Sequence, residues 1–128
     1  MATIKWVDEK NTVILSRHEG DFTPELLIDV IKTAYDMIET VPHEVYVVQD
    51  LREMGHFKGA RLGRFREMRQ HVHPRIAQTI MAGIESGDFR MAMMDIYSRV
   101  FANKIIFFDT LEEAFEHIGV EMPADSLD

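Results

Sequence analysis

Residues 23–50 have the sequence TPELLIDVIKTAYDMIETVPHEVYVVQD, an amphipathic helix followed by a continuous apolar strand. Thr23 is suited to cap the helix, and Pro24 suits its first turn. Apolar residues recur at helical spacing until Pro42 prevents the helix from continuing. Because residues 45–48 are apolar without alternation, we expect a central strand covered on both faces. A helix that leads directly into such a strand is typical of α/β folds.

The sequence on either side predicts further strands and helices in alternation. Two short apolar runs, residues 4–6 and 13–15, flank a turn containing Asn11, and this pattern is typical of a β-hairpin. We expect a loop at 18–22, helices at 59–72 and 89–102, strands at 76–84 and 104–108, and a last helix that begins with a capping box of Thr110 and Glu113 and ends at Gly119.

This order predicts one α/β domain over residues 1–120, with a frayed tail at 121–128. We expect a mainly parallel sheet of about five strands that carries an N-terminal hairpin and is flanked by about four helices.

The composition narrows the possible functions. The chain has 128 residues, 46% of them hydrophobic, and no cysteine, which excludes disulfides, thiolate metal sites and thiol nucleophiles. No apolar run reaches the ~20 residues that a membrane-spanning helix needs, and the N-terminus lacks the apolar core of a secretory signal. We therefore expect a cytoplasmic protein without membrane insertion.

The charge is unevenly distributed along the chain. The net charge is −8, but residues 58–75 carry +5, so the remainder carries −13. On the predicted helix of this basic segment, Arg64 and Arg69 flank one apolar stripe and Arg66 lies near Arg69. Their long side chains could cover the edge of the core, or they could bind an anion or an acidic partner. The acidic remainder argues against nucleic acid as that partner.

Three segments resemble the SpoIIAA-like family, which is related to the STAS domains of anti-sigma-factor antagonists. EGDFTPELLIDVI (19–31) is similar to the family's first loop and helix, and VYVVQDLREM (45–54) to its central strand. KIIFFDTLEEAFEHI (104–118) is similar to its last strand and helix. The resemblance implies the family's STAS-like fold, which has been compared with the lipid-binding Sec14 fold. It implies no activity, since most members of the family have none assigned.

The resemblance also allows a regulatory mechanism to be tested. In phosphorylation-switched STAS antagonists, a serine at the start of the helix after the central strand accepts the phosphate. This chain has no serine or threonine between Val41 and Gln78. Without a hydroxyl group in this region, a phosphate cannot regulate docking there.

Few residues are candidates for catalysis. Asp50 and Asp109 are expected just beyond two strands, at the edge where α/β sheets place ligands, and His18 and Arg52 could approach the same rim. Two carboxylates there could act as an acid and a base, but such residues more often form turns or cap helices. His71 and His73 are two residues apart and would not share a helix face. We therefore expect no catalytic residue, metal site or cofactor.

The segment 89–102 carries the most unusual pattern. Met91, Met93 and Met94 cannot all point in one direction on a helix, so at least one should face away from the core. With Tyr97 and Phe101 they could form a core helix, a homodimer interface or the wall of an apolar-ligand pocket. We expect a non-enzymatic binding module that self-associates as a homodimer or binds a protein partner. The alternatives are a carrier of a small apolar or lipid-like molecule and, third, an enzyme with its site near Asp50.

Overall fold

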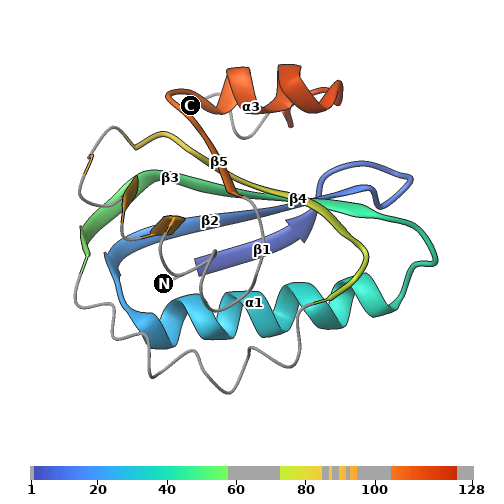
Figure 1. The fold of residues 1–128 in the computed structure, drawn as a ribbon, viewed down its shortest axis with the longest axis horizontal. Coiled ribbons are helices and arrows are strands. Elements are labelled where there is room, and N and C mark those ends of the chain that lie inside the picture. The colour runs from blue at the N-terminus through green and yellow to red at the C-terminus, as the bar shows by residue number, and fades with distance from the viewer. Residues whose placement is uncertain are drawn as a thin grey trace.

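The computed structural model describes residues 2–57, 73–84, 87, 90–91, 93–94 and 105–123, which form an α/β fold. Within these residues, one sheet lies between two helices that cover opposite faces (Figure 1). The strands are β1 (Ala2–Trp6), β2 (Val13–Phe22), β3 (Val45–Phe57), β4 (Ile76–Ala82) and β5 (Ile105–Phe108), and the helices are α1 (Pro24–Glu39) and α3 (Leu111–Ile118).

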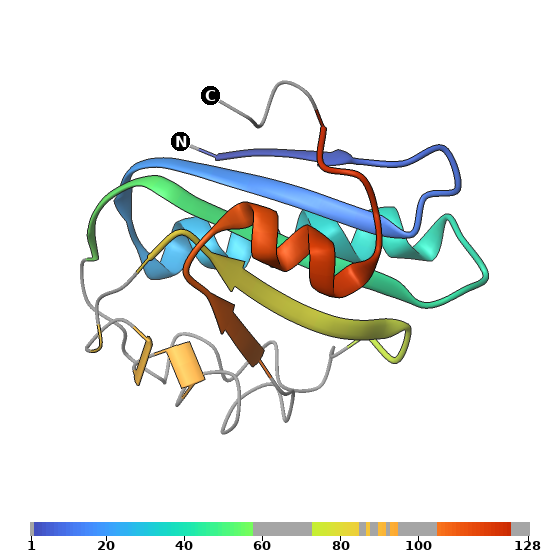
Figure 2. The ribbon, with the colours of Figure 1, turned by 90° about the horizontal axis from the view of Figure 1, so that it is seen from above.

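The five strands form one mixed sheet in the order β1-β2-β3-β4-β5, which is also their order in the chain (Figure 2). β1 and β2 are antiparallel, and every later pair is parallel. The predicted mainly parallel sheet with an N-terminal hairpin is confirmed. In the hairpin turn, Asn11 has a φ of 54°, and the Asp8 carboxylate accepts hydrogen bonds from the backbone N–H groups of Thr12 (2.8 Å) and Val13 (3.2 Å).

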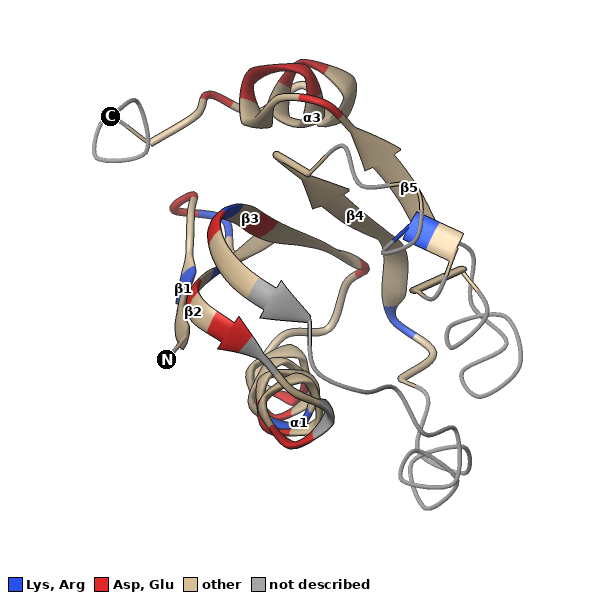
Figure 3. Ribbon diagram, turned by 90° about the vertical axis from the view of Figure 1, so that its left-hand side faces the viewer, with Lys and Arg blue, Asp and Glu red and all other residues tan. Residues whose placement is uncertain are grey.

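Alternation along the strands divides the core into two layers. Ile14 points to the face covered by α1, whereas its neighbours Val13 and Leu15 point to the face covered by α3. The α1 layer also contains Ala34, Ile38, Val45 and Val47, and the α3 layer Val48, Ile80, Ala82, Leu111, Ala114 and Phe115. The outer faces of both helices carry acidic side chains (Figure 3).

Both helices begin and end as their sequences predict. The Thr23 hydroxyl accepts a hydrogen bond from the backbone N–H of Leu26 (3.2 Å), and that of Thr110 from Glu113 (3.1 Å). These bonds satisfy N–H groups that have no partner within the helix. Gly119 ends α3 with a φ of 83°, a left-handed conformation that glycine adopts readily.

Two strands are longer than predicted. The expected loop at 18–22 is wrong, because β2 continues to Phe22, and β3 continues to Phe57 rather than ending at Asp50. Each extension is stabilised by the other through the register Glu19↔Glu53, Gly20↔Met54 and Phe22↔Phe57. The sequence does not predict these extensions, since they contain polar residues and glycines that seldom form strands. Their pairing also joins residues that are far apart in the chain.

Other predictions fall on residues that the structure does not describe. The helix at 59–72 lies outside them, as does 89–102 apart from residues 90, 91, 93 and 94, which are helical. Residues 124–128 of the predicted tail also lie outside. Among the described helices, none has the length and apolar character needed to cross a membrane.

Candidate functional site

The carboxyl edge of the sheet is stepped, and this step positions the candidate residues. Arg17, Asp50, Ala82 and Phe108 lie in one row across β2, β3, β4 and β5. β4 and β5 end at this row, whereas β2 and β3 continue beyond it. We predicted that Asp50 lies just past the end of its strand, but it lies inside β3. It is nevertheless level with the ends of the neighbouring strands β4 and β5. Asp109 directly follows β5, as predicted.

Asp50 is held by an arginine from its own strand. Its carboxylate is 1% exposed and accepts hydrogen bonds from the Arg52 backbone N–H (3.1 Å), Nε (2.9 Å) and Nη2 (2.8 Å). These side-chain bonds raise the pKa of Arg52 above its ordinary value and keep the guanidinium charged. Gly83 packs against the same arginine: a Cβ at this position would lie 2.5 Å from Arg52 Cγ. The Arg52 side chain, about a quarter exposed, thus lies between the buried Asp50 and the point where the chain leaves β4.

Asp109 is paired with a different arginine. Arg90 Nη2 donates to Asp109 Oδ1 (2.8 Å) and, together with Nε, to the carbonyl oxygen of Ile84 (2.6 and 3.0 Å). The guanidinium carbon also lies 5.3 Å from the centre of the Phe107 ring. Arg90 therefore connects the helical turn that carries it to the ends of β4 and β5. The two candidate carboxylates have separate cationic partners, and β4 lies between their strands.

The methionine-rich segment divides as its spacing predicts. Met93 is completely buried, whereas Met91 is 72% and Met94 53% exposed. Residues three apart on a helix share a face, so Met91 and Met94 point out together. We call these two side chains the methionine surface. Tyr97 and Phe101, predicted to belong to it, lie outside the described residues.

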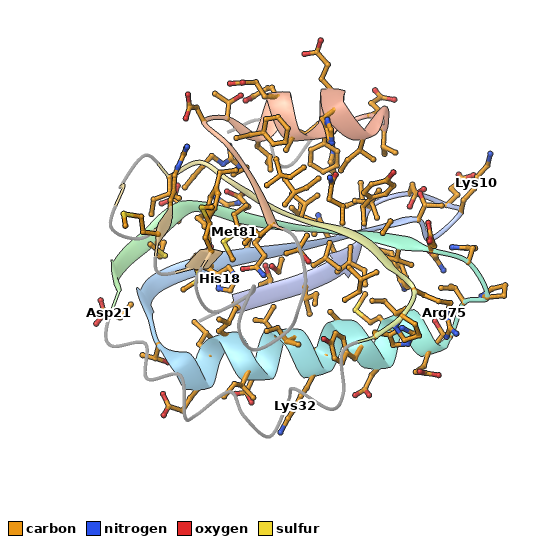
Figure 4. All side chains as sticks on the ribbon, viewed as in Figure 1. Lys10, His18, Asp21, Lys32, Arg75 and Met81 are labelled. Atoms are coloured by element: carbon orange, nitrogen blue, oxygen red, sulfur yellow. The ribbon has the colours of Figure 1, made fainter. Side chains whose placement is uncertain are left out.

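One end of the basic segment is described, and it contacts α1. Arg75 donates to the carbonyl oxygen of Ile38 (3.3 Å) and lies 3.7 Å from the Glu39 carboxylate, near the C-terminal end of α1 (Figure 4). His73 is also bound to Glu39 through Nε2 (2.8 Å), while its Nδ1 accepts the Arg75 N–H (3.2 Å). These two residues anchor the chain before β4. Arg64, Arg66 and Arg69 lie outside the described residues, so their role stays a prediction.

His18 lies on the α1 side of the sheet, where it is buried, and its burial was not predicted from the sequence. His18 is 1% exposed and follows Ile14 and Ser16 on this face, so its side chain is buried in the core, and the charge of Asp50 still acts on it. Ser16 Oγ lies 3.4 Å from His18 Nε2. Gln49 and Thr79 are also buried. The missing signal was the length of β2: alternation from Ile14 places His18 in the core once the strand extends past it.

Burial determines the charge of His18. Removal from water lowers the pKa of His18 from 6.5 to about 4, although the negative charge of Asp50 and a hydrogen bond with Gln49 act in the opposite direction. His18 is therefore neutral near pH 7. Among the described residues, no group of three or more histidine, aspartate or glutamate side chains could hold a metal ion.

The comparisons with known proteins agree on the fold. No protein-family model matches the chain, and no curated protein matches its sequence. Among solved structures, it is similar to an uncharacterized protein of the DUF3478 family with a SpoIIAA-like fold from Shewanella loihica PV-4. That match has a TM-score of 0.57 and 10% sequence identity, and it covers 91% of this chain and 92% of the other.

A second similar structure is the anti-sigma factor antagonist SpoIIAA in its unphosphorylated form. The TM-score is 0.52 with 19% sequence identity, and the match covers 93% of this chain and 98% of the other. Likeness at these identities concerns the fold alone. Together with the mixed sheet and its flanking helices, it shows that this chain has a SpoIIAA-like fold, related to that of STAS domains.

Proposed function

We propose that this chain is a non-enzymatic, cytoplasmic binding module that self-associates through the methionine surface. The observation that carries the proposal is the exposure of Met91 (72%) and Met94 (53%), the large apolar side chains that stand out at the surface of the described residues. Met93, between them, is fully buried. The segment thus packs one apolar side against the protein and presents another to its surroundings.

The contacts of Arg90 support a preformed surface. Its bonds to Ile84 and Asp109 connect Arg90, which directly precedes Met91, to residues that follow β4 and β5. A surface held in place loses less conformational entropy on binding than one that must first become ordered. Methionine side chains also adapt their shape to an apolar partner, including a second copy of themselves.

The two candidate carboxylates, Asp50 and Asp109, each pair with a different arginine, and this supports a function without catalysis. Asp50 is bonded to Arg52, and Asp109 to Arg90. A general acid and base need to reach a common substrate, and two structural ion pairs on different strands do not favour that arrangement.

The expected association is weak. Fully burying a methionine side chain is worth about 1.5–3 kcal/mol. A symmetric pair would bury four such side chains that are already partly covered, and association costs several kcal/mol in lost freedom of motion. These two terms nearly balance, so we expect association only at high protein concentration. Because each copy carries a net charge of −8, added salt should strengthen the pair by screening repulsion.

Sedimentation velocity or size-exclusion chromatography with light scattering, from 5 to 500 μM, tests this proposal. The wild type should shift from monomer to dimer, and Met91→Glu/Met94→Glu should remain monomeric. Met91→Leu/Met94→Leu keeps the surface apolar and should still associate. Lys10→Gln/Lys32→Gln makes the same change in net charge at exposed positions elsewhere and should also associate.

A wild type that remains monomeric at 500 μM would refute self-association. If native mass spectrometry of that monomer then showed a co-purified lipid, the alternative function of an apolar-ligand carrier would replace it. Equal association of the glutamate and leucine variants would show that the chain pairs through another surface.

A further inference from the structure

Sulfur chemistry in this chain belongs to methionine alone. The sequence has nine methionines and no cysteine, so two-electron oxidants such as peroxides have only thioether sulfurs to attack. The described methionines differ widely in exposure. Met91 and Met94 are 72% and 53% exposed, whereas Met81 and Met93 are completely buried. Among the methionines that the structure describes, oxidation should therefore begin at the methionine surface.

This difference in exposure arises from the fold. Met91, Met93 and Met94 lie within four consecutive positions, so their different exposure does not come from different regions of the chain. The guanidinium group of Arg90, bonded to Ile84 and Asp109, holds the start of this turn. Within the same segment, Met93 is buried in the protein whereas Met91 and Met94 are exposed. Met93 is thus an internal control for any reaction at the surface.

We infer that Met91 and Met94 form a reversible oxidation site, and that their oxidation dissociates the dimer proposed above. The modification follows from exposure alone, whereas its effect on association rests on the proposed function. A peroxide transfers one oxygen atom to each thioether sulfur: the O–O bond breaks, the S–O bond forms, sulfur loses two electrons and the peroxide is reduced to water or an alcohol. Methionine sulfoxide reductases, one for each sulfoxide epimer, reverse the change with two electrons from a dithiol, which becomes a disulfide while the oxygen leaves as water.

Oxidation should weaken association because it makes the methionine side chains polar. A thioether is apolar and can be buried against a second copy without loss of hydrogen bonds. A sulfoxide oxygen is a strong hydrogen-bond acceptor, and burying it without a donor costs roughly 1–3 kcal/mol. Two sulfoxides on each copy are enough to abolish a weak pair. Since pairing covers Met91 and Met94, oxidation should also become slower as the protein concentration rises.

Peptide mass spectrometry tests the modification. Native protein is treated with hydrogen peroxide, quenched with catalase and free methionine, and digested with trypsin. The peptide of residues 91–99 contains Met91, Met93 and Met94, and the peptide of residues 76–90 contains Met81 as its one methionine. We expect the first peptide to gain two oxygen atoms, assigned by fragmentation to Met91 and Met94. Met93 and Met81 should react at least about tenfold more slowly until guanidinium unfolds the protein.

Light scattering on the same samples tests the effect on association. Oxidised wild type at 500 μM should be monomeric, and treatment with both epimer-specific methionine sulfoxide reductases and a dithiol reductant should restore the dimer. Met91→Leu/Met94→Leu cannot be oxidised at the surface and should remain associated after peroxide treatment.

Each outcome decides one part of the inference. Oxidation of Met93 as fast as Met91 would refute the modification site, even with a dimer present. Loss of association in the peroxide-treated leucine variant would place the controlling oxidation elsewhere and overturn the switch. An untreated wild type that is monomeric throughout would refute the proposed function and the control of association with it, while the oxidation pattern would still decide the modification site.

Discussion

Acidification should destabilise this fold through His18. Burial lowers the pKa of its imidazole to about 4 in the folded chain, against 6.5 in the unfolded chain. Between these values the unfolded state binds the proton more tightly, so stability is fully present above pH 6.5 and falls as the pH drops toward 4. The whole loss is about 3 kcal/mol, because each pKa unit corresponds to about 1.4 kcal/mol. About 2 kcal/mol of it should already be lost at pH 5.

Urea denaturation followed by circular dichroism at pH 8, 7, 6 and 5 measures this effect. His18→Gln replaces the imidazole with a neutral polar side chain and removes its titration. Between pH 8 and pH 5, the wild type should lose about 2 kcal/mol more stability than this variant. Contributions from other titrating groups occur in both proteins and cancel. His43→Gln removes an exposed histidine instead and should behave as the wild type.

Parallel stability profiles for wild type and His18→Gln would refute the reasoning, because they would mean that His18 titrates alike in the folded and unfolded chains. If the variant fails to fold, the wild-type imidazole can be titrated directly by NMR. A midpoint near pH 4 would support a buried neutral histidine, and a midpoint near 6.5 would contradict it.

Three further changes test the sheet and its carboxyl edge by urea denaturation. Arg52→Ala should destabilise the fold by about 3 kcal/mol, because it leaves the buried Asp50 carboxylate without its cation; an equal loss in Arg52→Lys would contradict an essential bidentate pair. Gly83→Ala should cost more than about 1 kcal/mol, since the glycine has a φ of 90° and a Cβ would lie 2.5 Å from the Arg52 side chain. An unchanged stability of Gly83→Ala would show that the Arg52 side chain can move to make room for the Cβ. Asp8→Ala removes the acceptor for Thr12 and should cost about 1–2 kcal/mol, whereas Asp8→Asn, which keeps an acceptor oxygen, should cost less.

The elements with local signals could be predicted from the sequence. The hairpin was recognisable from two apolar runs and Asn11, and α1 and α3 from helical periodicity with caps at Thr23 and Thr110. Each of these signals depends on residues within one turn or one short segment. A single sequence contains such information without knowledge of the partner strands.

The full lengths of β2 and β3 could not be predicted, because the residues beyond His18 and Asp50 are mostly polar or glycine. They are strands because they pair with each other across the α1 crossover. This error carried over to the candidate site: it placed Asp50 beyond its strand and His18 in a loop. Helical spacing, by contrast, predicted that at least one of Met91, Met93 and Met94 faces away from the core, but not which.

The agreement between sheet order and chain order has a consequence for synthesis. Each strand adds to the outer edge of those already made, so the growing sheet never has to open to admit a later strand. The two faces, however, are completed at different times. The α1 layer can close once β3 is made, whereas Val13 and Leu15 on the other face pack, among the described residues, in one cluster with α3, which is made last. Until then the nascent chain exposes an apolar sheet surface, which is where we expect chaperones to bind it.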